Sequence, residues 1–263
     1  MRGIMARLFL VFLFSLAVIK AGAQVTTVPV EYRDGDVVLQ GYFSYDPAIK
    51  GARPGVLIVH DWLGVSEYTR MRAEQLAALG YAALAADVYG KGVRPRNAQE
   101  ASGEAGKYYK GRQLYRARLR AGLSYLMSRP EVDTSRLAAM GYCFGGAGAL
   151  ELARSGAPLR GVVTFHGALN TPDPADAKKI RGKVLVLHGA DDPYVKPEEV
   201  KSFMDEMRGG GVDWQLVYYS GAVHSFTDRR AGNDNSKGAA YNEAADRRSW
   251  EAMKNFFSEV FAR

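Results

Sequence analysis

Short apolar runs alternate with longer amphipathic runs along this chain of 263 residues, and this alternation restricts its fold more than any other feature. Runs such as 56–60 are apolar almost throughout, as expected for strands buried on both faces of a parallel sheet. Strands are predicted at 37–43, 56–60, 81–86, 137–141, 161–165, 184–188 and 214–219, and helices at 68–79, 113–127, 145–155, 197–207 and 241–261, with a loop and a short helix in 89–111. This order predicts one α/β domain, with a mostly parallel sheet and helices on both of its faces.

Residues 1–23 have the three parts of a secretory signal peptide. Two arginines form a basic start, residues 8–19 form an apolar run, and the sequence Ala-Gly-Ala that ends at Ala23 offers a cleavage site. A membrane anchor is the alternative, but the run is shorter than the ~20 residues that cross a bilayer, and Lys20 ends it. We therefore expect cleavage after Ala23, a secreted or periplasmic mature chain of residues 24–263, and no stable membrane insertion of that chain.

The charge pattern argues against a nucleic-acid partner. The formal net charge is +7 at pH 7, and three of the positive charges lie in the predicted signal peptide. Elsewhere, basic residues alternate with acidic ones. The nearest approach to a basic stripe is made by Arg112, Arg116, Arg118 and Arg120, whose helical spacing beside leucines is typical of the solvated face of an amphipathic helix. No binding to nucleic acid is expected.

Cysteine and histidine usage limits the cofactors that the chain could hold. Cys143 is the only cysteine, so neither an intramolecular disulfide nor a cysteine-based zinc site can form. The four histidines are dispersed, without an i, i+4 pair or a carboxylate cluster that would suit a metal ion. We expect no metal and no other cofactor, and we expect a monomer.

Cys143 lies in the sequence Gly-Tyr-Cys-Phe-Gly-Gly over residues 141–146, between a predicted strand and a predicted helix. This is the context of a nucleophile elbow, in which a sharp turn exposes the central residue and glycines two residues away leave room around it. The helix N-terminus stabilises negative charge on a thiolate at that point. The alternative is a glycine-rich packing turn with a buried, inert cysteine.

Two downstream segments favour the catalytic interpretation. Asp192 lies in a turn after the predicted strand 184–188, and His224 lies in a loop of small residues after the last predicted strand. Nucleophile, acid and histidine thus follow the order of α/β-hydrolases, each at the carboxyl end of a strand. Asp192 fits the motif better than Asp191, which we interpret as a turn or capping residue. The pattern predicts a triad of Cys143, Asp192 and His224, in which the acid orients the histidine and the histidine moves the proton.

The segment His-Asp-Trp-Leu-Gly that starts at His60 lies where an α/β-hydrolase supplies its second oxyanion-hole amide. We assign the oxyanion hole to the backbone N–H groups of Trp62 and Phe144. His166 and His188 each end an apolar strand and are predicted to be residues at the edge of the core, without a catalytic role.

The sequence resembles the dienelactone hydrolases, which are carboxymethylenebutenolidase-like α/β-hydrolases, from about residue 37 to residue 261. The resemblance rests on the cysteine segment, on Asp192 and His224 in their turns, on the sequence Asp-Val-Tyr that ends at Tyr89, and on the segment at His60. It implies an α/β-hydrolase fold. It also implies hydrolysis of a small-molecule ester or lactone through a thioester on Cys143.

The resemblance suggests roles for further residues. In the family an acidic residue holds the resting thiol and helps it to ionise, and Asp61 stands in that place, although the family's usual residue is glutamate. Tyr89 matches an active-site tyrosine and would line the pocket. Family members that act on dienelactone hold its carboxylate with arginines, one of them four residues after the histidine. Asp228 stands there, followed by Arg229 and Arg230, so either a neighbouring arginine takes the role or the substrate has no carboxylate.

Two other kinds of function remain open at this point. A thioesterase or peptidase would use the same triad, because acyl transfer does not fix the leaving group. A catalytically silent small-molecule binding protein would keep the fold without the chemistry. The reactivity of Cys143 toward an alkylating reagent separates the enzymes from the silent protein.

Overall fold

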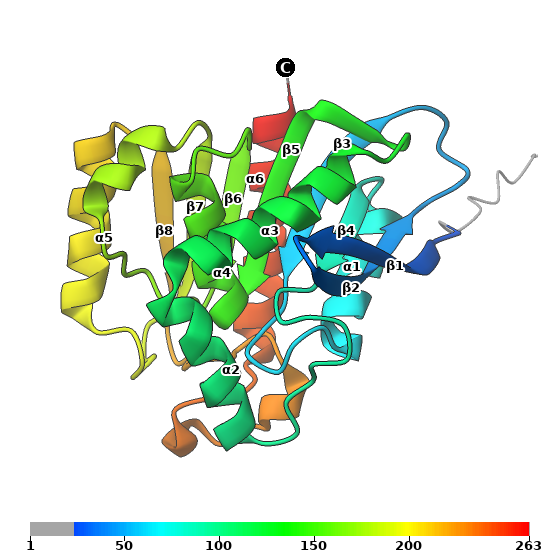
Figure 1. Cartoon of the computed structure of the whole chain (residues 1–263). Coiled ribbons are helices and arrows are strands. Elements are labelled where there is room, and N and C mark those ends of the chain that lie inside the picture. Colours follow the sequence, from blue (N-terminus) through cyan, green and yellow to red (C-terminus); the bar gives the residue numbers. More distant parts are fainter. Residues whose placement is uncertain (1–23, 263) are drawn as a thin grey trace, which may run out of the picture.

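The computed structural model describes residues 24–262, and Figure 1 shows one sheet with helices packed against both of its faces. The predicted signal peptide lies outside the described residues. The strands follow the spatial order β1-β2-β4-β3-β5-β6-β7-β8. β1 and β2 are antiparallel to their neighbours, and the other strands are parallel to one another. The strands are β1 (Thr26–Asp34), β2 (Val37–Tyr45), β3 (Arg53–Val59), β4 (Ala82–Ala86), β5 (Val132–Tyr142), β6 (Gly161–Phe165), β7 (Lys183–Gly189) and β8 (Trp214–Tyr219).

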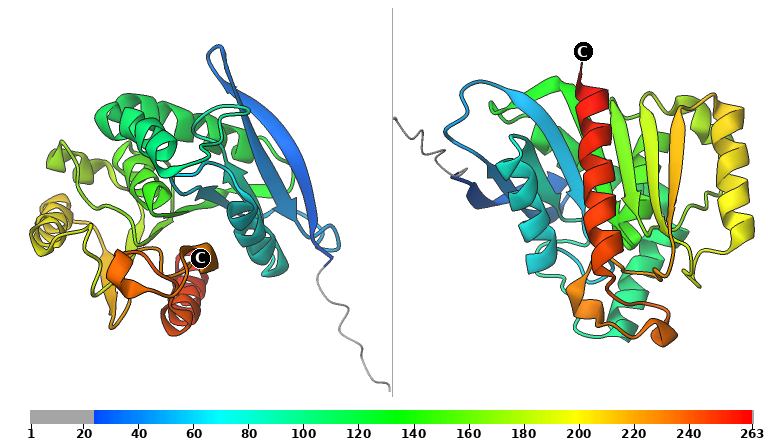
Figure 2. Two further views of the ribbon diagram at one scale, coloured as in Figure 1. Left: turned by 90° about the horizontal axis from the view of Figure 1, so that it is seen from below. Right: turned by 180° about the vertical axis from the view of Figure 1, so that it is seen from behind.

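Two groups of helices cover the sheet, and alternate residues of each strand face one group or the other. In β3, Val56 and Ile58 belong to the core under one group, and Leu57 and Val59 belong to the core under the other. In Figure 1, α3 and α4 cross in front of the sheet and α6 lies behind it, and Figure 2 shows α6 from its own side. The first group is α1 (Glu67–Ala78) and α6 (Glu243–Phe261); the second is α2 (Ala98–Lys110), α3 (Arg112–Met127), α4 (Phe144–Arg154) and α5 (Pro197–Gly210).

The predicted α/β-hydrolase fold is confirmed, with two differences in its elements. The strand β1 was not expected from the sequence. Only Tyr32 among its residues is buried, because β1 is an edge strand and lacks the continuous apolar run of a central strand. The helix α2 is longer than the short helix expected in 89–111, since its two glycines weaken the helical signal. Across residues 24–262, no helix is long and apolar enough to cross a membrane.

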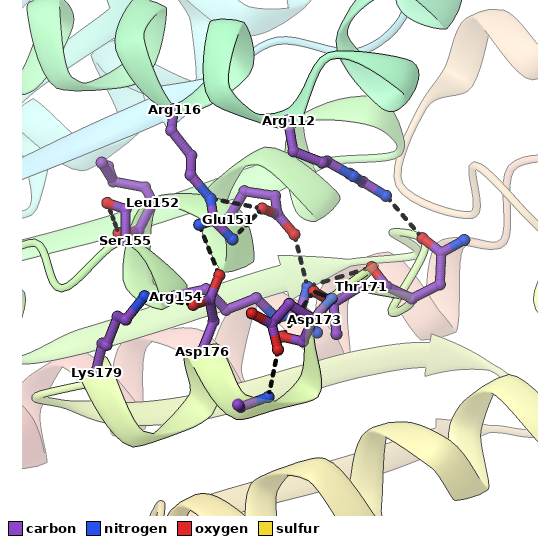
Figure 3. A network of polar contacts seen from close by, with 12 residues as sticks. Arg112, Arg116, Glu151, Leu152, Arg154, Ser155, Thr171, Asp173, Asp176 and Lys179 are labelled. Atoms are coloured by element: carbon purple, nitrogen blue, oxygen red, sulfur yellow. Dashed lines mark hydrogen bonds and ion pairs between the residues drawn. The ribbon is translucent and has the colours of Figure 1, made fainter.

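The expectation of a solvated arginine face on α3 is wrong for two of its four residues. Arg116 and Arg118 are each only 8% exposed. Arg116 reaches Glu151 on α4 and Asp176 at 2.8 and 2.7 Å, as Figure 3 shows, and Arg118 pairs with Asp34 at the end of β1. These arginines are buried because each one meets a carboxylate from another element, which a pattern within one helix cannot reveal.

A second buried ion-pair cluster ties α4 to α5. Arg154, at the last turn of α4, is fully buried and pairs with Glu151 at 3.1 Å and with Glu206 of α5 at 2.7 Å. Its Nη2 also donates to the Leu169 carbonyl at 2.7 Å. Removing one partner of a buried pair costs about 3–5 kcal/mol, because the other charge is left uncompensated. The helix that follows Cys143 is therefore fixed from its far end.

Candidate active site

Cys143 lies between β5 and α4 at φ 54° and ψ −116°, a conformation that few residues with a side chain adopt. The turn is possible because the residues two positions before and after Cys143 are glycines. A Cβ atom on Gly145 would collide with the carbonyl oxygen of Val59, and one on Gly141 would collide with the carbonyl oxygen of Gly145. The sequence thus places Cys143 at a tight elbow at the N-terminus of α4, where the helix dipole favours negative charge.

The predicted acid and histidine are brought into contact. Asp192 follows β7, its side chain is fully buried, and its Oδ2 accepts a hydrogen bond from His224 Nδ1 at 2.8 Å. Its Oδ1 accepts from the Tyr194 amide at 2.8 Å. Asp191 is exposed, in agreement with its interpretation as a turn residue. The contact fixes the orientation of the imidazole, with Nδ1 toward Asp192 and Nε2 on the other side of the ring.

The charge state of His224 depends on the groups around it. Burial of the ring would lower its pKa, but the charge of Cys143 and hydrogen bonds to Asp192 and Cys143 outweigh it and raise the pKa of His224 to about 10. Because this value lies above the ordinary 6.5, the charged ring stabilises the fold fully below pH 6.5 and progressively less as the pH rises toward 10.

We expect an NMR titration to separate His224 from the other three histidines. His224 should keep both ring protons until the pH approaches 10. Burial lowers the pKa of His60, His166 and His188, so their rings should stay neutral at pH 6.5. The Cys143→Ala variant is the control and should lower the midpoint of His224, since it removes one source of the shift. Four histidines with midpoints near 6.5 would contradict this electrostatic description.

The backbone amides of Trp62 and Phe144 have no hydrogen-bond acceptor among the described residues. Phe144 is the first residue of α4, so its N–H group is free by position in the helix. The Trp62 carbonyl accepts from the Tyr89 hydroxyl at 3.0 Å, and His60 Nδ1 contacts the Asp61 carbonyl at 2.6 Å. The segment that carries Trp62 is thus held by the rings of Tyr89 and His60, which pack edge to face.

Tyr89 is placed differently from its expected role. It is 5% exposed, and its hydroxyl holds the Trp62 carbonyl, while the residue is not part of the lining of the small cavity at Cys143. His60 is fully buried, and its Nε2 accepts from the Val88 amide at 3.2 Å. Both residues therefore help to fix the position of the backbone around the Trp62 amide.

Asp61 lines the cavity at Cys143, and its carboxylate has partners other than the thiol. Its Oδ1 accepts from the Leu63 amide at 2.7 Å, and its Oδ2 pairs with Arg230 Nη2 at 2.7 Å. The same Arg230 nitrogen contacts Asp228 at 2.7 Å. Burial raises the pKa of Asp61, which the Leu63 amide and Arg230 oppose. Arg230 is thus shared between two carboxylates next to the site.

Two cavities adjoin at this edge of the sheet. The smaller, of about 30 Å³, contains Cys143 in its lining. The larger, of about 590 Å³, lies over α1 and the loop after His224, and it shares Tyr68 and Asp228 with the smaller one. Only the larger has room for the body of a small-molecule substrate. No group of His, Cys, Asp or Glu side chains suited to a metal ion occurs within residues 24–262.

A hydrogen-bonded row next to His224 was missed by the sequence analysis. The Tyr68 hydroxyl on α1 contacts Thr227 Oγ1 at 2.7 Å, and Thr227 Oγ1 contacts His166 Nε2 at 2.8 Å. The His166 ring lies edge-on to the His224 ring, with centroids 5.1 Å apart. His166 also lines the small cavity, so it is buried as expected but belongs to the site. Its φ of 41° is unusual for a residue with a side chain, but the sequence carries no signal for it.

Known proteins match this chain over most of its length. A family model described as the dienelactone hydrolase family matches residues 40–261. A solved structure named m3DLH is 44% identical, covers 92% of this chain and 100% of its own, and has a TM-score of 0.88. The crystal structure of a dienelactone hydrolase-like promiscuous phosphotriesterase from metagenomic libraries is 47% identical, covers 90% of this chain and 99% of its own, and has a TM-score of 0.87. A curated but uncharacterized protein of Caenorhabditis elegans is 35% identical over 147 residues, which are 55% of this chain and 93% of that protein.

Proposed function

This chain belongs to the dienelactone hydrolase family and is a hydrolase of ester or lactone bonds, and from that premise we propose that it uses a Cys143, His224 and Asp192 triad and a thioester acyl-enzyme. The observation that carries the proposal is the 2.8 Å contact between His224 Nδ1 and Asp192 Oδ2, at the same sheet edge as the elbow of Cys143. The raised pKa of His224 supports it, since Cys143 is one of the causes.

In the proposed acylation step, the Cys143 thiolate attacks the substrate carbonyl carbon. The N–H groups of Trp62 and Phe144 stabilise the oxyanion that forms. The tetrahedral intermediate collapses to a thioester as His224 Nε2 gives its proton to the leaving alkoxide. Asp192 keeps the ring oriented and stabilises its charge. In the second step, water attacks the thioester, His224 takes the water proton, and the thiolate leaves.

We propose that the substrate is a neutral ester or lactone. Arg230 pairs with Asp61 and with Asp228, and both of these carboxylates line the small cavity. Two carboxylates around one guanidinium leave an excess of negative charge there, which disfavours a substrate carboxylate. The larger cavity shares Tyr68 and Asp228 with the smaller one. We therefore place the body of the substrate in the larger cavity.

A second activity is proposed from one comparison. The relative described as a promiscuous phosphotriesterase is 47% identical and matches 90% of this chain. A neutral phosphotriester with a good leaving group offers a tetrahedral electrophile to the same thiolate, and its developing negative oxygen meets the same amide donors. We propose slow phosphotriester cleavage by Cys143 beside the main esterase activity.

A substrate panel combined with alkylation tests these proposals. We expect turnover of an activated neutral ester and of a neutral lactone, weaker turnover of a lactone that bears a carboxylate, and slow release of nitrophenol from a neutral phosphotriester. One equivalent of iodoacetamide on Cys143 should abolish every activity together. An unreactive Cys143 with no turnover would instead favour the silent binding protein, and cleavage of peptides alone would favour a peptidase.

We also propose that the protein is exported and acts outside the cytoplasm. The basic and apolar composition of residues 1–23 supports export, and an exported form would then begin at Gln24. An accessible thiol outside the cytoplasm is exposed to oxidation, so keeping Cys143 there fits a requirement for thiol chemistry.

A further inference from the structure

The ring of His224 is oriented by one hydrogen bond and by two rings that pack against it. The hydrogen bond joins Nδ1 to Asp192 Oδ2, and a ring held at one atom can still rock about that contact. The rings of Tyr194 and His166 lie edge-on to His224, with centroids at 5.2 and 5.1 Å from its own. Tyr194 is 60% exposed, whereas His166 is 2% exposed. Exposed side chains change rotamer readily, so His166 is the ring that can hold His224 still.

His166 is fixed both at its ring and at its backbone. Its Nε2 contacts Thr227 Oγ1 at 2.8 Å, and its backbone N–H donates to the Leu187 carbonyl at 2.9 Å. Its φ of 41° is one that residues with a side chain keep only where their surroundings determine it. Burial and the charge of His224 lower the pKa of His166 well below its ordinary value. A neutral ring therefore packs on His224 and does not repel its charge.

Thr227 is anchored from two helices. It is buried, and its Oγ1 contacts the Tyr68 hydroxyl of α1 at 2.7 Å. Its carbonyl accepts a hydrogen bond from Arg72 Nη2 at 3.0 Å, and the same nitrogen pairs with Asp246 of α6 at 2.6 Å. Arg72 is buried as well, so this ion pair is a fixed part of the wall. α1 and α6 thus hold Thr227, and Thr227 holds the ring of His166.

We propose that Thr227 and His166 are positioning residues for the hydrolysis. Thr227 fixes the ring of His166, and His166 keeps the ring of His224 in the orientation that proton transfer at Nε2 requires. The inference rests on the proposed role of His224. Neither positioning residue forms a bond to the substrate or exchanges a proton. Both steps of the proposed reaction pass a proton through His224, so a misplaced ring slows acylation and deacylation together.

One substitution made at two buried threonines tests the proposal. Thr227→Val keeps the shape of the side chain and removes the hydroxyl, whereas Thr227→Ser keeps the hydroxyl. The matched control is Thr69→Val. Thr69 is also buried and follows Tyr68 on α1, but its Oγ1 has no hydrogen-bond partner within residues 24–262, so the same change removes no contact there. Stopped-flow kinetics with p-nitrophenyl acetate measure acylation in the first turnover and deacylation in the later ones.

In Thr227→Val we expect both rates to fall roughly tenfold or more, because a misplacement of about 1 Å can cost about 10²-fold in rate. KM should stay near the wild-type value, since both steps slow together. Thr227→Ser and Thr69→Val should behave as the wild type does. Wild-type rates in Thr227→Val, a change confined to KM, or an equal fall in either of the other two variants would overturn the proposal.

His166→Asn decides the matter if Thr227→Val fails to fold. Asparagine adopts a positive φ more readily than most residues, and the change removes the ring that packs on His224. Both rates should fall as in Thr227→Val, and wild-type rates would overturn the proposal. His224→Ala distinguishes a failure of the underlying chemistry. If it is as active as the wild type, the triad itself is wrong; if it is inactive while the positioning variants are unimpaired, only the positioning role is wrong.

Discussion

The Cys143→Ala variant should lose roughly 10³-fold or more of kcat/KM on an activated ester, because a triad acts as a unit and its nucleophile has no substitute. His224→Ala should lose a similar amount, since it removes the group that moves the proton. Cys143→Ser should retain weak activity at most. A serine hydroxyl needs full general-base assistance, whereas a cysteine is intrinsically nucleophilic and can react as the thiolate. Steady-state kinetics on the three purified variants provide the measurement.

The adjacent aspartates provide a matched control for this prediction. Asp192→Asn should leave residual activity, because it disturbs the orientation and charge of His224 and leaves the nucleophile in place. Asp191→Asn changes an exposed side chain one residue away and should be close to the wild type. A larger loss for Asp191→Asn than for Asp192→Asn would show that the acid was chosen wrongly.

The Gly145→Ala variant should be destabilised by about 3 kcal/mol or more, at the upper end of what overpacking costs. Its new Cβ would collide with the carbonyl oxygens of Val59, the last residue of β3, and of His60, which begins the segment that carries Trp62. Either α4 or that segment must move, so the Trp62 and Phe144 amides would shift relative to each other. A misplacement of about 1 Å can cost about 10²-fold in rate. Denaturant unfolding and kcat/KM measure the two effects.

Gly103→Ala is the control for Gly145→Ala. Gly103 lies within α2, and a Cβ atom there would have nothing within 4 Å. Alanine is the better helix former by about 1 kcal/mol, so this variant should be as stable as the wild type or more stable. If both alanine variants had the same stability, the elbow would not depend on close contact at Gly145.

Local sequence patterns were enough to predict the fold and the residues of the candidate triad. β6 lies at the predicted residues 161–165, because a central strand has a continuous apolar run with clear ends. β8, at the edge of the sheet, also lies at its predicted residues 214–219. Cys143, Asp192 and His224 each follow a strand, and the carboxyl ends of parallel strands share one edge of the sheet. Spacing along the chain therefore predicted proximity in space.

Contacts between distant segments could not be predicted in the same way. Tyr68 and Thr227 are 159 residues apart, and Asp61 and Arg230 are 169 residues apart. No periodicity within one element reports such pairs. The burial of Arg116 likewise depends on a carboxylate of α4, so an amphipathic pattern in α3 alone suggested solvent instead of an ion pair. The first two of these contacts decide how His166 and the segment that carries Trp62 are held.

The identity of the acylated residue tests the proposed chemistry most directly. The enzyme would be acid-quenched during turnover of p-nitrophenyl acetate, digested, and mapped by tandem mass spectrometry. Acetyl should be found on the peptide that contains Cys143, at that residue, and should be lost on treatment with hydroxylamine, as expected of a thioester. Acetyl on Ser225, another residue that lines the small cavity, would contradict a cysteine nucleophile.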